Sequence, residues 1–337
     1  MAFCKFFGEC PVCKFQHLTY GESLKRKGER VRRAMETEVE VVSSPLDRGY
    51  KVRSILHVRK PEPGNLIVGY TLERGFVFGV DECPIMHPAL SRLLPKINSV
   101  LAPTPLSVWD AEKGRGKLVS LTLLGDENGV ILSLNLRRPV FVKRLTFDVM
   151  DRVPGIVGVW WSVGTFGEHI TGGRGEIIRA FHVERETFKV SPYGEYPDNL
   201  SVLPDLWRFL KRTLEGRTVA FMTGLYVPPY LMTTYVDNRG MPIKEVVDTA
   251  KVYGAHPDVR QMNPAAFPMV SDEPYDFVIL NADRVRDREV LAVGRRAVVM
   301  GRDVRRVKEM APSSKPERVL MFDLGPYTED SLVVALY

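Results

Sequence analysis

The 337-residue sequence has few cysteines and lacks several features that would narrow its class. It holds four cysteines and six histidines, and no apolar run is long enough to cross a bilayer. The histidines show no H-E-x-x-H spacing, which excludes the helical zinc-protease motif. There is no low-complexity tract and no signal-peptide pattern in MAFCKFFGEC. With 45% hydrophobic and 26% charged residues, the sequence predicts a cytoplasmic globular protein of two domains.

Positive charge is concentrated near the N-terminus. Residues 1–60 contain 13 Lys/Arg and 7 Asp/Glu, so this segment alone accounts for the net charge of +6. A local excess of this kind suits a phosphate-binding surface. Solvated surfaces are often basic as well, so charge by itself leaves both interpretations open.

The four cysteines form a pattern of three plus one. Cys4, Cys10 and Cys13 follow C-x5-C-x2-C, and Cys83 lies in D-E-C-P-I-M-H-P. Without a targeting signal, disulfides are not expected. Three thiols on a short loop and one distant thiol can close a tetrahedral site for a 4Fe–4S cluster or for zinc. Zinc more often uses two close pairs, so the pattern favours iron–sulfur; unrelated buried cysteines are the alternative.

A basic amphipathic helix is predicted after the third cysteine. Thr19 and Glu22 fit a capping box, and apolar residues recur at helical spacing as far as Met35. The strand-like segment of residues 48–60 is also basic. These two segments supply the first candidates for RNA contact: Lys25, Arg26, Lys27, Arg30, Arg32, Arg33, Lys51 and Arg53. Ordinary solvated surfaces are the alternative.

The order of elements predicts two kinds of fold. Residues 1–200 contain hairpin patterns, one of them at 118–136, and a helix near 88–102, which indicates an α+β domain. After residue 200, strands and helices alternate, which predicts a doubly wound, Rossmann-like α/β sheet with parallel strands. The glycine-rich residues 164–176 match no phosphate-loop motif, so we expect a flexible connection there.

A second basic segment lies late in the chain. Residues 284–308 contain nine Lys/Arg. Such a surface suits phosphate binding, whereas a thermophile's ion-pair network is the alternative. The further candidates for RNA contact are Arg302, Arg305 and Arg306.

Together these segments resemble the RNA 5-methyluridine methyltransferases, which methylate C5 of uracil in transfer and ribosomal RNA. The resemblance is strong over residues 4–100 and thinner to about 200. It rests on the cysteine pattern, on a C-P-x-x-H-P segment at residues 83–88, and on these further matches: Gln16, His17, Tyr20, Leu24, Lys27, Val31, Gly49, Tyr50 and Arg53. The resemblance implies a 4Fe–4S cluster on Cys4, Cys10, Cys13 and Cys83, with a structural role.

The second half is similar to the family in outline but departs from its chemical motifs. The family uses a cysteine in an S-C-N-P segment that adds to uracil C6. Residues 299–303 here read Val-Met-Gly-Arg-Asp, without a thiol, and the glycine-rich turn at 221–229 carries one glycine and two prolines. These departures predict no catalytic residue, leave cofactor-binding residues unknown, and make S-adenosylmethionine doubtful as a cofactor.

The resemblance therefore predicts an RNA-binding iron–sulfur protein of archaeal type that has lost catalysis. Residues 1–200 would form the iron–sulfur and RNA-binding domain, and residues 201–337 a degenerate methyltransferase-type domain. The expected partner is structured RNA, with ribosomal RNA or the ribosome first and tRNA second; no membrane is involved, and protein partners stay unknown. The alternative is an active S-adenosylmethionine-dependent RNA methyltransferase acting on rRNA or tRNA. A third hypothesis is an electron-transfer or redox-sensing role.

Overall fold

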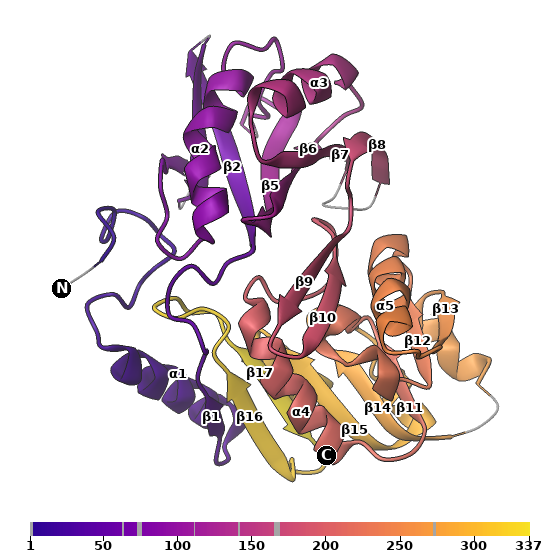
Figure 1. Cartoon of the computed structure of the whole chain (residues 1–337). Helices are drawn as coiled ribbons and strands as arrows, with labels where there is room; N and C mark the ends of the chain where they lie inside the picture. Colours follow the sequence, from indigo (N-terminus) through magenta and orange to yellow (C-terminus); the bar gives the residue numbers. More distant parts are fainter. Residues whose placement is uncertain are drawn as a thin grey trace. The chain divides into compact units, whose positions relative to one another are not determined.

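The chain folds into two compact units (Figure 1). The structure is a computed structural model and describes residues 3–62, 64–72, 76–110, 112–140, 142–164, 169–271 and 274–337. Unit 1 comprises Met1–His17, Arg48–Arg179 and Ser191–Tyr193, and unit 2 comprises Leu18–Asp47, Ala180–Val190 and Gly194–Tyr337. The units do not follow a single cut at residue 200, because Leu18–Asp47 packs with the C-terminal part of the chain.

Unit 1 contains a seven-stranded sheet in the order β4-β3-β2-β5-β6-β7-β8. Adjacent strands are antiparallel except β6 and β7. The bounds are β2 (Arg53–Glu62), β3 (Asn65–Thr71), β4 (Val77–Gly79), β5 (Leu118–Asp126), β6 (Gly129–Leu136), β7 (Ile156–Val163) and β8 (His169–Gly175). The two predicted hairpins, β2–β3 and β5–β6, are confirmed. The expectation of a flexible connection at residues 164–176 is wrong, since most of this segment pairs with β7 as β8.

Two helices of unit 1 share its hydrophobic core with the sheet. They are α2 (Pro88–Leu101) and α3 (Lys143–Arg152). α2 buries the stripe that contains Leu90, Leu94 and Ile97, as its spacing predicts. α3 begins after Val142, which makes no side-chain cap, so no start signal for this helix is present in the sequence.

Unit 2 contains an eight-stranded sheet in the order β1-β16-β17-β15-β14-β11-β12-β13. β17 is antiparallel to both its neighbours, and the other described pairs of this sheet are parallel. The bounds are β1 (Glu40–Val42), β11 (Thr218–Phe221), β12 (Thr234–Asp237), β13 (Asp258–Gln261), β14 (Tyr275–Asn281), β15 (Gly294–Gly301), β16 (Arg318–Phe322) and β17 (Leu332–Leu336). β12 and β13 lie on one side of β11, and β14 and β15 lie on its other side. The strand order therefore reverses at β11, which confirms the prediction of a doubly wound sheet.

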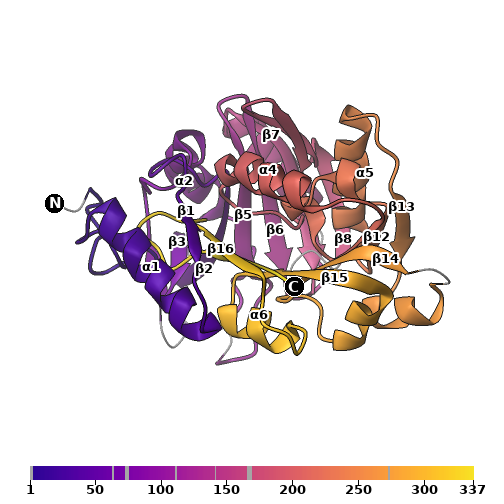
Figure 2. The same ribbon diagram turned by 90° about the horizontal axis from the view of Figure 1, so that it is seen from below.

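Helices cover both faces of the unit 2 sheet. Figure 2 shows α1 (Tyr20–Met35) and α6 (Val304–Met310) on one face, and α4 (Leu203–Thr213) and α5 (Gly240–Val252) on the other. The capping box of Thr19 and Glu22 is present at the start of α1. A separate two-stranded ribbon is formed by β9 (Arg179–Val183) and β10 (Glu186–Val190). In the described ranges, no helix combines the length and apolar character that crossing a membrane requires.

Candidate functional site

The carboxyl ends of β11, β12, β14 and β15 lie along one edge of the unit 2 sheet. Doubly wound sheets bind their ligands at this edge, next to the strand where the order reverses. Here β11 is that strand, with β12 on one side and β14 on the other. The residues that end these strands are therefore the first candidates for a site.

Asp237, the last residue of β12, has a fully buried side chain. Its carboxylate accepts hydrogen bonds from the Tyr235 hydroxyl at 2.8 Å and from Arg239 Nε at 3.0 Å and Nη2 at 2.9 Å. Burial, and then the charge of Asp237, raises the pKa of Tyr235. Burial alone would lower the pKa of Arg239, but hydrogen bonds and charge from Asp237 and Glu195 raise it. Arg239 is therefore a permanent cation held on this carboxylate.

Glu195 joins the ends of two strands through its carboxylate. Its Oε2 accepts from Arg239 Nη1 at 2.9 Å and from Arg284 Nε at 2.8 Å, and its Oε1 accepts from Asn281 Nδ2 at 3.4 Å. The Glu195 side chain is only 11% exposed, so the carboxylate that these ion pairs share is largely shielded from water. We call Glu195, Asp237, Arg239 and Arg284 the edge ion-pair cluster.

The backbone amides of the turn after β11 donate hydrogen bonds to other groups of the protein. This turn forms a short 3-10 helix, η3 (Gly224–Tyr226). The bonds are Gly224 N to Tyr235 Oη at 3.2 Å, Leu225 N to the Glu195 carbonyl at 2.9 Å, and Tyr226 N to the Thr223 carbonyl at 3.2 Å. The turn therefore packs against the edge ion-pair cluster.

Replacing Gly224 by alanine is expected to lower the free energy of unfolding by about 3 kcal/mol. Gly224 has φ +53°, and a β-carbon there would lie 2.0 Å from the Glu195 carbonyl oxygen. Gly254→Ala is the matched control, because φ is +65° there and nothing lies within 4 Å. Urea unfolding measures both, and equal losses would contradict the close packing of η3.

β15 ends at Gly301, within residues 299–303, which contain no cysteine. The Asp283 carboxylate ties this end to β14 by accepting from the amides of Arg302 at 2.6 Å and Asp303 at 3.2 Å. A β-carbon at Gly301 would lie 3.1 Å from Val307 and 3.2 Å from Asp283, so there is little space for a side chain. The four cysteines of the chain all belong to unit 1. This edge therefore holds no thiol.

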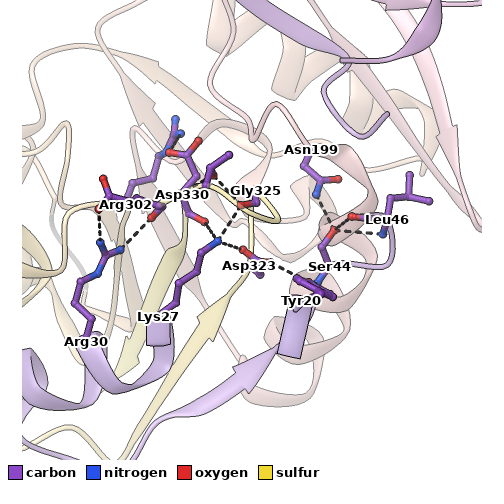
Figure 3. Close-up of polar contacts among 12 residues, drawn as sticks. Tyr20, Lys27, Arg30, Ser44, Leu46, Asn199, Arg302, Asp323, Gly325 and Asp330 are labelled. Atoms are coloured by element: carbon purple, nitrogen blue, oxygen red, sulfur yellow. Dashed lines mark hydrogen bonds and ion pairs between the residues drawn. The ribbon is translucent and has the colours of Figure 1, made fainter. Parts of the chain in front are cut away.

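The late basic residues predicted to contact RNA are ion-paired with carboxylates. Arg302 donates to Asp330 at 2.8 Å (Figure 3). Arg305 lies 3.5 Å from Asp303, and Arg306 lies 3.3 Å from Glu309. These pairs agree with the alternative interpretation of this segment as an ion-pair network. RNA contact by the three arginines stays a prediction.

Lys27 is buried in unit 2 and does not face solvent. Its side chain is 1% exposed, and Nζ donates to Asp323 Oδ1 at 2.6 Å and to the Gly325 carbonyl at 2.8 Å (Figure 3). The Tyr20 hydroxyl donates to the other oxygen of Asp323 at 2.8 Å. Lys27 therefore holds α1 against the C-terminal segment, and its assignment as an RNA contact is corrected on this ground.

The other early candidates divide by exposure. Lys51 and Arg53 of unit 1 are buried, with exposures of 9% and 8%, which leaves little of either side chain for RNA. The remaining candidates lie on the exposed side of α1: Lys25, Arg26, Arg30, Arg32 and Arg33. For these five, RNA contact stays a prediction.

The four cysteines border one small hollow in unit 1, lined by Cys4, Cys10, Cys13 and Cys83. Its volume is about 10 Å³, close to the room that one water needs. Burial raises the pKa of Cys10 and raises that of Cys13 to about 12. Within the described ranges, no three His, Cys, Asp or Glu side chains are placed to hold a metal ion. The prediction of a 4Fe–4S cluster on these cysteines is therefore contradicted.

Comparison with known proteins connects both units to one group of enzymes. The tRNA (uracil(54)-C(5))-methyltransferase of Pyrococcus horikoshii is 33% identical over 228 residues, which cover 65% of this chain and 54% of the relative. The protein of the same name from Pyrococcus abyssi is 32% identical over 256 residues, covering 72% and 58%. The chain is a relative of the RNA uracil-C5 methyltransferases. It spans little more than half the length of these curated uracil-C5 relatives.

The fold agrees with the sequence relatives. The crystal structure of the Pyrococcus abyssi tRNA (uracil-54, C5)-methyltransferase in complex with S-adenosyl-L-homocysteine matches with a TM-score of 0.72 and 18% identity. The match covers 96% of this chain and 85% of that one. The mixed α/β, methyltransferase-like fold is therefore confirmed. No model of a known protein family matches the chain.

These relatives correct the prediction of an RNA-binding protein without catalysis. The uracil-C5 relatives carry the names of enzymes, and the matching structure was solved with S-adenosyl-L-homocysteine. Two further predictions are wrong on the same ground: that the protein is not an enzyme, and that S-adenosylmethionine is doubtful as its cofactor. The alternative from the sequence, an active RNA methyltransferase, is the better supported one.

The edge residues fit S-adenosylmethionine only in part. An acidic residue at the end of the second strand of such a sheet binds ribose hydroxyls, and Asp237 stands at that place. Its oxygens are already bonded to Tyr235 and Arg239, so a ribose fits only where Arg239 leaves the carboxylate. Sequence reasoning missed this site, although the segment T-T-Y-V-D carried the signal of a β-rich run ending in an acid.

Proposed function

We propose that the chain is an S-adenosylmethionine-dependent methyltransferase of structured RNA, with its reaction centre at the carboxyl edge of the unit 2 sheet. The observation that carries the proposal is the relationship to tRNA uracil-C5 methyltransferases over 65% to 72% of the chain. The matching fold and the parallel strands that end at this edge support it. Within this proposal, unit 1 mainly binds RNA and unit 2 carries the methyl transfer.

The residues of the edge have distinct roles in this proposal. Asp237 holds the ribose of the methyl donor, and Arg239 must move for that bond to form. Arg284, which is 49% exposed, lies beside the switch point and faces an incoming phosphate. Because the edge holds no cysteine, a covalent thiol adduct of the base is not part of the proposal. We propose that the methyl acceptor is an RNA base. Analysis of the modified nucleosides, described next, would identify which base it is.

Methyl transfer from labelled S-adenosylmethionine to RNA tests the proposal directly. Unmodified transcripts of tRNA and of 23S rRNA fragments, offered separately, should show incorporation that S-adenosyl-L-homocysteine suppresses. Nucleoside analysis then identifies the product; 5-methyluridine would indicate the uracil-C5 reaction. The expected preference is for tRNA, as in the names of the uracil-C5 relatives with the highest identity. Absence of label from every RNA would contradict the proposal.

A further inference from the structure

A basic surface outside the proposed reaction centre surrounds a hollow in unit 1. The hollow has a volume of about 560 Å³. Val142 and Leu145 contribute to its apolar lining, and Lys117, Arg144 and Arg152 also border it. None of these three cations was among the sequence candidates for RNA contact.

Four more cations extend this rim. Arg137 follows β6 directly, and its amide donates to the carbonyl of Lys117 at 2.7 Å. The guanidinium of Arg174, on β8, lies 4.2 Å from the ring centroid of Phe147, on α3. We call the whole set the α3 basic surface: Lys117, Arg137, Arg138, Lys143, Arg144, Arg152 and Arg174. On α3 itself, Asp148 and Asp151 are the only carboxylates that accompany these cations.

The cations of the α3 basic surface are exposed and have no carboxylate partner among the described residues. This differs from the cations of unit 2, where Arg239, Arg284 and Arg302 each pair with a carboxylate at 2.9 Å or less. Gathering unpaired like charges opposes folding through their mutual repulsion. Arg137 and Arg174 lie over the rings of Trp109 and Phe147, but these contacts do not neutralise the charge, so the cluster points to an anionic partner.

The chemistry of the surface favours RNA over an acidic protein. Five of the seven cations are arginines, whose planar forks bind phosphate oxygens in pairs. Arg144 and Arg152 lie on one side of α3, about 12 Å apart along the helix axis. Phe147 is 37% exposed, and the guanidinium of Arg174 lies over its ring.

We propose that the α3 basic surface binds the sugar-phosphate backbone of the RNA substrate, separately from the carboxyl edge of unit 2. The inference rests on the proposed function, because it takes the substrate to be RNA. Its role is to supply affinity and orientation without touching the methylated base. Binding should therefore be steeply salt-dependent, with little dependence on sequence.

A charge-matched pair of triple variants tests the inference on the full chain. Arg137→Ala, Arg144→Ala and Arg152→Ala together remove three cations that have no carboxylate partner among the described residues. The control, Arg208→Ala, Arg260→Ala and Arg296→Ala, removes three exposed arginines that pair with carboxylates. Both variants lower the net charge equally. We expect the first to raise the Kd for a tRNA transcript on the order of a hundredfold at 0.15 M salt, and to reduce the log–log salt slope by about 2.7. The control should stay within about threefold of the wild type.

The outcomes separate the inference from the proposed function. Arg→Lys substitutions at the three positions keep the charge and should retain most of the salt slope, which distinguishes lost phosphate contacts from damaged folding. Equal Kd values for the two alanine triples would overturn the inference and leave an acidic protein as the occupant. If the first triple weakens RNA binding but the wild type transfers no methyl group, the inference stands and the proposed function fails. A wild type that binds no RNA overturns both.

Discussion

Replacing Lys27 by methionine is expected to lower the free energy of unfolding by about 3–5 kcal/mol. The substitution removes the ammonium but leaves the carboxylate of Asp323 buried with Tyr20 as its remaining side-chain donor. It also leaves the Gly325 carbonyl without its 2.8 Å bond to Lys27. A buried charge without its counter-ion costs far more than an exposed ion pair contributes.

Two comparison variants make the Lys27 experiment specific. Lys308→Met breaks the exposed pair with Glu36 and should change stability by less than about 1 kcal/mol. The double variant Lys27→Met with Asp323→Leu removes both charges and should recover most of the loss. Burial lowers the pKa of Lys27 despite the opposing effect of Asp323, so desolvation outweighs the attraction within the pair. Urea unfolding followed by circular dichroism measures all three; a loss under 1 kcal/mol for Lys27→Met would contradict the buried network.

The position of Lys27 was readable from the sequence. The apolar stripe of α1 passes through Tyr20, Leu24, Val31 and Met35, and Lys27 fills the gap between the second and third of these. A cation on the buried stripe of an amphipathic helix must find a counter-ion inside the protein. Its partner, 296 residues away in the chain, could not be predicted because no local pattern encodes so distant a contact.

The elements that sequence predicted best are those with a strong local signal. α1 has a capping box, and β14 and β15 are continuous apolar runs between turns, so pattern alone located them. β12 has four residues, two of them polar, and was not recognised. Missing β12 hid Asp237 and with it the edge ion-pair cluster.

Spacing was a weaker guide to the cysteines than to the helices. The C-x5-C-x2-C pattern does gather the thiols, since all four line the same hollow. Spacing along a loop, however, does not fix the directions of the side chains or their protonation. Burial raises the pKa of Cys13 to about 12. The pattern predicted proximity, whereas metal binding was a further step, and the described residues form no metal-binding group.

Neighbouring substitutions in the edge ion-pair cluster should change cofactor affinity in opposite directions. Asp237→Asn removes the charged acceptor for the ribose and should weaken S-adenosylmethionine binding about tenfold to a hundredfold. Arg239→Gln frees the same carboxylate of its 2.9–3.0 Å bonds from the guanidinium. If only molecules with Arg239 displaced bind the cofactor, this change enlarges the competent fraction and should tighten binding about tenfold.

Calorimetric titration of both variants with S-adenosylmethionine and S-adenosyl-L-homocysteine distinguishes a ligand site from a purely structural one. In a structural cluster, either substitution breaks the same ion pair, so both would destabilise the fold and neither would improve binding. The Arg239→Gln protein should lose stability without ligand, because Asp237 stays buried with only Tyr235 as its side-chain donor. It should regain more stability than the wild type when ligand is added, since binding then replaces the missing partner. Weaker binding by both variants would contradict the placement of the ribose on Asp237.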